Sequence, residues 1–303
     1  MNAPRDIPGP NPTVRRPVYP VPRAACDSHM HVFPDPARYP FAPQRPVTPP
    51  IVTLDDYRKV MEALGIERVV LVQSSVYGDD NRGCFDACEA LGEQGRAIAV
   101  VRSAEQLDKG TVASMHRRGC RGVRINLWHN ALSDPKSELL NCARKIADAG
   151  WHIQLFAHAG SIAELAPFLG TLPVPVVLDH FGMVPAGPQD DRIISPILGL
   201  LATGSGWIKL SAAYRLDLAG GGYSGMAPWA GRLVRENPER LLWGSDWPHP
   251  DVQSATPGVP GPMPDTAGLL DTLTLWRIDE RVIRKILVDN PCRLYGFAPP
   301  PAN

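Results

Sequence analysis

Two short segments near opposite ends of the sequence contain residues that could carry out acid–base or metal chemistry. His29 and His31 are separated by one residue in DSHMHVF, and Asp246 lies in LLWGSDWPHP. Because alternate residues of a β-strand point to the same side, the two imidazoles could reach one metal ion or one oxyanion. An aspartate beside them could act as the general base that takes a proton from water. His180, in VVLDHFG, is a further candidate for this site.

Each of these residues also has a structural interpretation. A His-x-His pair can be satisfied by ordinary hydrogen bonds, Asp246 could be the N-cap of a helix, and His180 could be a core histidine bonded to Asp179. Position favours the functional interpretation, since the first segment opens the expected fold and the last one closes it. We therefore predict that His29, His31, His180 and Asp246 form one catalytic site.

Arg124 and Arg215 are the candidates for binding a substrate anion. A guanidinium can make two parallel hydrogen bonds to a carboxylate and is costly to bury alone, although either residue could form a structural ion pair instead. His158, which follows the fifth expected strand, has no assigned role, and His152, at the start of that strand, is interpreted as structural. Four more polar residues near strand ends are expected to contact the substrate: Ser75, Tyr77, Asn126 and His249.

Short apolar runs alternate with segments of helical period from residue 24 onward. The runs begin near residues 24, 68, 97, 122, 151, 176, 207 and 241. Nearly continuous apolar runs indicate strands buried on both faces, as in parallel sheets, and the intervals leave room for a helix after each strand. The first helix is well marked, since Thr53 and Asp56 suit a capping box and Gly65 suits a C-terminal stop.

This alternation predicts a single α/β domain, a (β/α)8 TIM barrel. In such a barrel of about 250 residues, the carboxyl ends of all eight strands meet at one rim. A doubly wound open sheet is the main alternative, but the sequence has no GxGxxG at a strand-to-helix turn. We assign residues 1–23 to a proline-rich N-terminal arm, 24–297 to the barrel and 298–303 to a C-terminal tail.

Composition limits the partners that we expect. The 31 basic and 31 acidic residues balance, so no overall positive field exists to attract nucleic acid or anionic lipid. The apolar runs are far shorter than the roughly 18 residues of a membrane span, and the first residues, MNAPRDIPGPNP, lack the apolar stretch of a secretory signal. We expect a cytoplasmic protein that acts on a small molecule, and a homo-oligomer is left open.

The combination of DSHMHVF, VQSSVYGDDN, RGVRINL, VVLDHFG, WIKLSAAYRLD, LLWGSDWPHP and NPCRLYGF, in this order, resembles a known family. It is similar to the amidohydrolase-related proteins typified by 2-pyrone-4,6-dicarboxylate lactonase. The resemblance implies a TIM barrel of the metal-dependent hydrolase type and hydrolysis of a lactone in a carboxylated small molecule, with Asp246 activating water. It also implies that three histidines surround the scissile carbonyl and that Arg124 and Arg215 hold substrate carboxylates.

The sequence departs from that lactonase at three positions. Asn130 and Met183 stand where the lactonase has arginines, and Phe156 stands where it has a tyrosine. These differences favour a substrate with one carboxylate, or a less charged lactone, over a dicarboxylate.

The resemblance leaves the metal open, because some members of this branch act without one and others need zinc. One divalent ion, zinc above all, could bind His29, His31, His180 and Asp246. The fourth strand, read as GVRIN, lacks the bridging lysine or glutamate of a binuclear centre.

Other activities fit the same residues. A lactone isomerase or a non-oxidative decarboxylase of the same superfamily also needs an acid–base pair, and a non-catalytic barrel could bind organic acids. Only hydrolysis introduces oxygen from water into the product.

Overall fold

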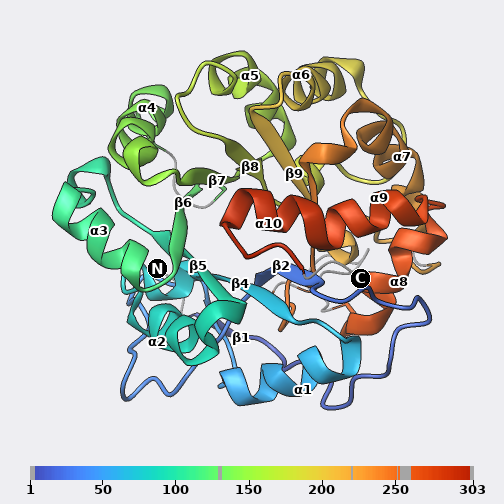
Figure 1. Ribbon diagram of the computed structural model, residues 1–303, viewed down its shortest axis with the longest axis horizontal. Helices are drawn as coiled ribbons and strands as arrows, with labels where there is room; N and C mark the ends of the chain where they lie inside the picture. The colour runs from blue at the N-terminus through green and yellow to red at the C-terminus, as the bar shows by residue number, and fades with distance from the viewer. Residues whose placement is uncertain (1–3, 129–131, 220, 251, 253–260, 301–303) are drawn as a thin grey trace.

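The computed structural model describes residues 4–128, 132–219, 221–250, 252 and 261–300. Eight parallel strands form one sheet in the order β10-β9-β8-β7-β6-β5-β4-β2, which confirms the predicted barrel (Figure 1). The strands are Cys26–Met30 (β2), Arg68–Val72 (β4), Gly95–Val100 (β5), Cys120–Asn126 (β6), His152–Phe156 (β7), Val176–Leu178 (β8), Gly206–Ser211 (β9) and Leu241–Gly244 (β10).

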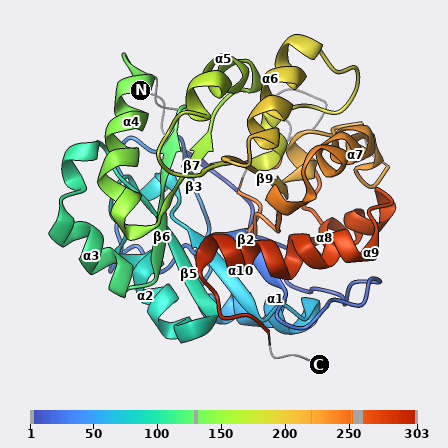
Figure 2. The same cartoon turned by 45° about the horizontal axis from the view of Figure 1, so that its top comes forward.

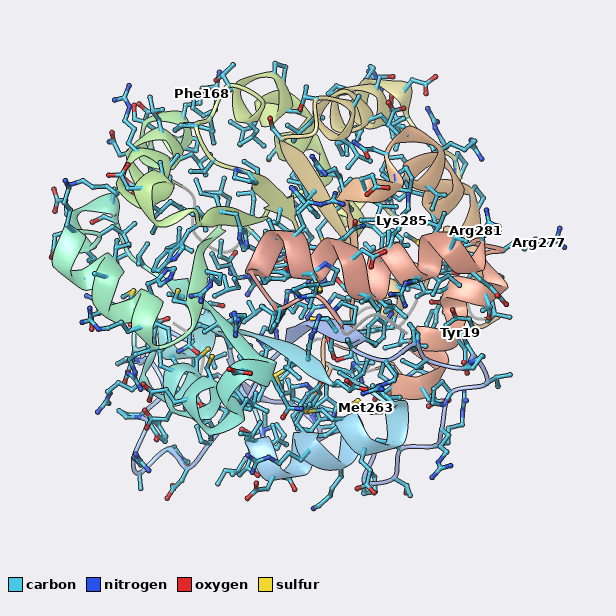
Figure 3. All side chains as sticks on the ribbon, in the orientation of Figure 1. Tyr19, Phe168, Met263, Arg277, Arg281 and Lys285 are labelled. Atoms are coloured by element: carbon cyan, nitrogen blue, oxygen red, sulfur yellow. The ribbon has the colours of Figure 1, made fainter. Side chains whose placement is uncertain are left out.

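A helix follows every barrel strand and lies in the outer layer (Figures 1 and 2). Charged side chains of this layer, such as Arg277 and Arg281, extend away from the barrel (Figure 3). Among the described residues, no helix is long and apolar enough to cross a membrane. The eight helices are Leu54–Leu64 (α1), Arg82–Leu91 (α2), Lys109–Arg117 (α3), Pro135–Ile146 (α4), Ala159–Leu169 (α5), Asp191–Ala202 (α6), Ala227–Glu236 (α7) and Thr266–Leu275 (α8).

The first of these helices begins and ends where the sequence predicts. Thr53 accepts a hydrogen bond from the backbone N–H of Asp56, and the Asp56 side chain accepts one from the N–H of Thr53, which is a complete capping box. Gly65 ends the helix at φ 72°, in the left-handed region that glycine adopts without strain.

The barrel closes between its first and last strands. Met30 pairs in parallel with Trp247, and the backbone N–H of Asp246 donates to the carbonyl of His29 at 2.8 Å. Gly244 is required at this seam, because a Cβ there would lie 2.6 Å from the Cβ of His29. Closure therefore brings the two ends of the sequence together at one point of the rim.

Side chains inside the barrel lie in layers, as expected for this fold. The register of β6 and β7 pairs Arg124 with Gln154 in the middle of the barrel and Asn126 with Phe156 at the rim. The amino-terminal end holds a separate apolar cluster that includes Tyr295 and Phe297. Both residues come after Glu280–Arg284 (α9). Tyr295 is the last residue of Asn290–Tyr295 (α10), which crosses that end of the barrel in Figure 1, and Phe297 follows this helix.

The proline-rich arm contacts the rest of the protein at several points. Arg15 forms ion pairs with Asp265 and Asp271, at 2.6 and 2.8 Å, next to α8. A two-residue strand of the arm, Arg5–Asp6 (β1), pairs in parallel with Val47–Thr48 (β3) in the loop that follows β2. Sequence patterns did not predict this pairing.

Candidate active site

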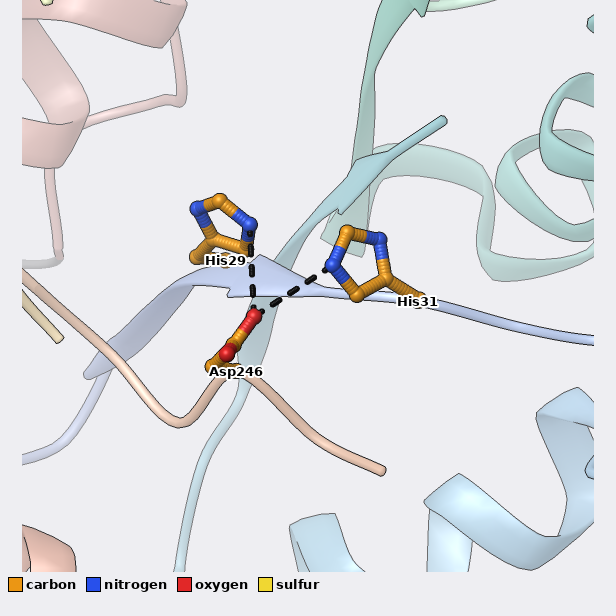
Figure 4. Close-up of side chains that lie close together, drawn as sticks. All are labelled: His29, His31 and Asp246. Carbon is orange, nitrogen blue, oxygen red and sulfur yellow. Dashed lines mark ion pairs between the residues drawn. The ribbon is translucent and has the colours of Figure 1, made fainter. Parts of the chain in front are cut away.

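Two histidines and an aspartate meet where the barrel closes (Figure 4). His29 is the fourth residue of β2, His31 follows the strand, and Asp246 follows β10. The Oδ1 atom of Asp246 lies 3.3 Å from Nε2 of His31 and 3.5 Å from Nε2 of His29. All three side chains are buried, so the predicted convergence of distant segments is present in the structure.

His180 lies beside this group. It begins a short helical turn after β8, and its Nε2 atom is 3.9 Å from Oδ1 of Asp246. Its Nδ1 atom is 2.9 Å from the hydroxyl of Ser211, at the end of β9. Burial lowers the pKa of His180 to about 4 even though Asp246 raises it, so this imidazole is neutral near pH 7.

Asp246 is held by its other oxygen. Oδ2 accepts hydrogen bonds from the hydroxyl of Tyr214 at 2.6 Å and from Nε of Arg215 at 3.2 Å. Burial opposes ionisation of Asp246, but Arg215, His180 and His31 outweigh it, and the pKa of this carboxyl lies well below its usual value. Asp246 is therefore ionised, with Oδ2 fixed by donors and Oδ1 directed at the histidines.

Arg124 occupies the opposite side of the site. Its Nε atom donates to Oδ2 of Asp179 at 3.0 Å, and its guanidinium lies 5.1 Å from the ring centre of Phe156. The side chain is 7% exposed and lines the cavity above Asp246. Arg124 thus has a structural partner through Nε, while its position at the cavity lets it meet an anion there.

Of the other residues predicted to contact a substrate, some line the cavity and others do not. Ser75 and Asn126 line it, and the side-chain amide of Asn126 donates to the Ser75 hydroxyl at 3.4 Å. Tyr77 is not among its described lining residues, since this ring packs against Phe41 and Phe33. Further residues that line the cavity are His31, Arg124, Phe156, His180, Arg215 and Asp246.

His249 lies behind the site. Its Nε2 atom is 3.0 Å from the hydroxyl of Thr266 at the start of α8, and its ring packs edge-on against Tyr214. Burial lowers its pKa to about 4. His249 therefore supports the aspartate segment from outside the described lining of the cavity, rather than contacting a substrate there.

The remaining sequence assignments have different outcomes. His158 is exposed and stacks on Trp128, with ring centres 3.7 Å apart. His152 is buried at the amino-terminal end of the barrel, 5.4 Å from the ring centre of Tyr295, as a structural residue there would be. Asn130 lies outside the described residues.

Three side chains at the site were not predicted. Tyr214 was missed because Ala212, at φ 52°, interrupts strand alternation and turns both Tyr214 and Arg215 toward Asp246. Asp179 was treated only as a neighbour of His180, yet its Oδ1 atom lies 3.2 Å from Nδ1 of His29.

The third unpredicted side chain is that of Lys209, which is completely buried inside the barrel. Its Nζ atom lies 3.3 Å from Nδ1 of His29, and burial lowers its pKa to about 8. The lysine in the apolar run WIKLS could have indicated a polar group inside the barrel, because a buried amine needs a polar partner.

Comparisons with known proteins identify the family. The amidohydrolase family model matches residues 26–297. The chain belongs to the amidohydrolase family. Relatives of this amidohydrolase include the 2-pyrone-4,6-dicarbaxylate hydrolase of Comamonas testosteroni, 34% identical, with 92% of each chain covered. The 4-sulfomuconolactone hydrolase of Rhizobium radiobacter is 36% identical, with 91% of each covered.

A solved amidohydrolase structure is similar over the whole barrel. It is a probable 2-pyrone-4,6-dicarboxylic acid hydrolase from Acinetobacter baumannii with citric acid bound, 26% identical, with a TM-score of 0.76. The alignment covers 90% of this chain and all of the other. The barrel fold is thus shared across the family branch.

The residues at the site have the chemistry of a mononuclear metal centre. Nε2 of His29 and Oδ1 of Asp246 are buried and have no hydrogen-bond partner among the described residues. Together with Nε2 of His31 they form a donor set that suits zinc, whereas His180, predicted as a fourth ligand, falls in a different group with His29 and Asp179. Strand β6 provides no bridging lysine or glutamate for a second ion.

Proposed function

We propose that this amidohydrolase opens the ring of a lactone that carries an anionic group, by hydrolysis. The observation that carries the proposal is the ionised Asp246, whose Oδ1 atom faces His31 and His180 in a cavity that Arg124 also lines. Relatives that act on a pyrone dicarboxylate and on a sulfomuconolactone support the substrate class. Both of those lactones carry acidic groups.

The chemistry follows from the positions of the donors and acceptors. A water molecule donates one hydrogen to Oδ1 of Asp246, which takes that proton as the oxygen attacks the lactone carbonyl. His180 is neutral and receives a hydrogen bond at Nδ1 if the Ser211 hydroxyl donates, so its Nε2–H can stabilise the oxyanion. The ring C–O bond then breaks, and Asp246 returns its proton to the departing oxygen.

Arg124 is assigned to the anionic group of the substrate. A carboxylate or sulfonate beside its guanidinium would place the ring over Asp246. Phe156 and Met183 are apolar, and among the described cavity residues Arg215 is the other cation, already engaged with Asp246. This arrangement supports one anionic group rather than two.

A divalent metal would be held by His29, His31 and Asp246, with His180 beside it. When bound, it would lower the pKa of a water molecule and polarise the carbonyl.

The decisive experiment measures lactone opening in ¹⁸O-labelled water. Lactones with one carboxylate, one sulfonate and no charge are incubated with metal-analysed protein, with and without chelator. We expect consumption of the anionic lactones, with one ¹⁸O in the new carboxylate. An unlabelled product would indicate an isomerase or a decarboxylase instead, and binding without turnover would indicate a non-catalytic barrel.

We also propose that the protein is cytoplasmic, that residues 24–297 are its catalytic domain, and that it does not bind nucleic acid. The balanced charge supports the absence of nucleic-acid binding, and the family match to residues 26–297 supports the extent of the domain. Size-exclusion chromatography with light scattering would test whether it forms a homo-oligomer.

A further inference from the structure

His29, in β2, and His31, just after it, have opposite kinds of hydrogen-bonding neighbour at Nδ1. Nδ1 of His31 lies 2.7 Å from the carbonyl oxygen of Val72, which can only accept a hydrogen bond. His31 therefore carries its proton on Nδ1 and directs the lone pair of Nε2 at the site. Nδ1 of His29 lies 3.3 Å from Nζ of Lys209, which always carries hydrogens to donate.

Lys209 is held in place by a buried network. Its Nζ atom donates to Oε1 of Gln154 at 2.7 Å, and Nε2 of Gln154 donates to Oδ2 of Asp179 at 3.1 Å. Arg124 donates to the same Asp179 oxygen. The lysine is therefore fixed from the side away from His29, and its remaining hydrogens are available to the imidazole.

Asp179 competes for the same nitrogen but is less well placed. Its Oδ1 atom lies 3.2 Å from Nδ1 of His29, yet it has no hydrogen-bond partner among the described residues. Both groups lie within reach of Nδ1, but only the lysine contact has the geometry of a hydrogen bond. Lys209 is the aligned partner of Nδ1.

We propose that Lys209 is a positioning residue that fixes the proton of His29 on Nε2, so that an N–H rather than a lone pair faces Asp246. With that proton, His29 directs an N–H toward Oδ1 of Asp246, 3.5 Å away, while His31 presents an acceptor. With the other tautomer, two imidazole lone pairs and a carboxylate oxygen converge, an arrangement that a cation must stabilise. Lys209 thus biases the site toward metal-free hydrolysis. The position of the proton on His29 does not depend on the proposed function. Only the effect of that proton on lactone hydrolysis by Asp246 rests on it.

The first test observes the tautomer directly. Full-length protein labelled with ¹⁵N-histidine and stripped of metal is examined by NMR, and the His29 signals are assigned by their loss in His29→Gln. We expect the proton on Nε2 and a bare Nδ1. A proton on Nδ1 of His29 in the unaltered protein would overturn the proposal, whatever the variants show.

The second test removes the donor while keeping the length of the side chain. In Lys209→Met no donor faces Nδ1 of His29, so we expect the His29 proton to move to Nδ1, on the side of the Asp179 carboxylate. Loss of one hydrogen bond should raise zinc affinity about tenfold and lower kcat for lactone opening by about the same factor. KM should stay within about twofold, because Arg124 remains at the cavity.

Lys59→Met is the matched control, since Lys59 is an exposed lysine of α1 paired only with Asp56 among the described residues. It should change neither tautomer, zinc affinity nor kcat. A folded Lys209→Met protein that keeps the proton of His29 on Nε2 contradicts the proposal. Should that variant not fold, the spectrum of the unaltered protein still decides. Because the tautomer is read without substrate, an Nε2–H signal in a protein that opens no lactone would contradict only the proposed function.

Discussion

Asp246→Asn separates the role of the carboxylate from its place in the fold. In this variant the amide oxygen should take the position of Oδ2, because Tyr214 and Arg215 both donate there, at 2.6 and 3.2 Å. The NH2 group must then replace Oδ1, 3.3 Å from Nε2 of His31. An amide nitrogen cannot accept a proton from water, so the variant keeps the shape of the site without its base.

The expected loss follows from this geometry. General-base catalysis contributes on the order of 10²–10⁴ in rate, and we expect kcat to fall about a thousandfold, or about 4 kcal/mol in activation free energy. KM should change little, because Arg124 is untouched. Replacing the charged acceptor of Arg215 should lower the free energy of unfolding by about 2 kcal/mol.

The assay combines steady-state kinetics on the best anionic lactone with urea unfolding. Asp217→Asn is the matched control, because Asp217 is a buried aspartate that accepts from the backbone of Gly225, outside the described lining of the cavity. The control should retain activity within about threefold. A folded Asp246→Asn protein that keeps more than a tenth of the original kcat would refute the assignment of the base.

Three further predictions concern substrate binding by Arg124, the closing seam at Gly244, and His152 at the amino-terminal end of the barrel. Arg124→Met should raise KM about a hundredfold for a carboxylated lactone and hardly at all for its methyl ester; equal effects on both would exclude a contact with the carboxylate. Gly244→Ala should lower the free energy of unfolding by about 3 kcal/mol, measured in urea, because the new Cβ meets the backbone of His29, and an unchanged midpoint would contradict this. Burial lowers the pKa of His152 to about 3, so on acidification the unfolded state binds a proton here before the folded state does, and His152 alone should remove about 3 kcal/mol of stability between pH 6.5 and pH 4. His152→Phe should flatten that slope in unfolding curves, and an equally steep slope would locate the acid sensitivity elsewhere.

The strands and the closing seam could be predicted because local signals agreed with the tertiary fold. Apolar runs marked all eight strands, and the capping box of Thr53 and the stop at Gly65 marked a helix. The β1–β3 pair could not be predicted, since it joins two-residue segments of proline-rich sequence that have no periodicity.

The catalytic group was predictable for a different reason than its supporting residues. His29, His31 and Asp246 lie where strands end, so topology alone brings them together. Tyr214 depends on a single residue in the left-handed region, Ala212, which redirects the chain after β9. A non-glycine residue in that region gives little sequence signal, so the turn that brings Tyr214 to Asp246 could not be predicted.

The buried charges explain why the supporting residues matter as much as the catalytic ones. Asp179 is shared by Arg124 and Lys209, at 3.0 and 3.8 Å, and Asp246 is paired with Arg215 at 3.1 Å. Removing one member leaves an uncompensated charge inside the barrel, which costs more than the pair itself contributes. Arg124 therefore links substrate binding to the Asp179 network, and through Lys209 to His29. Substitutions at Arg124 and Lys209 should consequently be non-additive in both stability and kcat, whereas either should add to a change at Lys59.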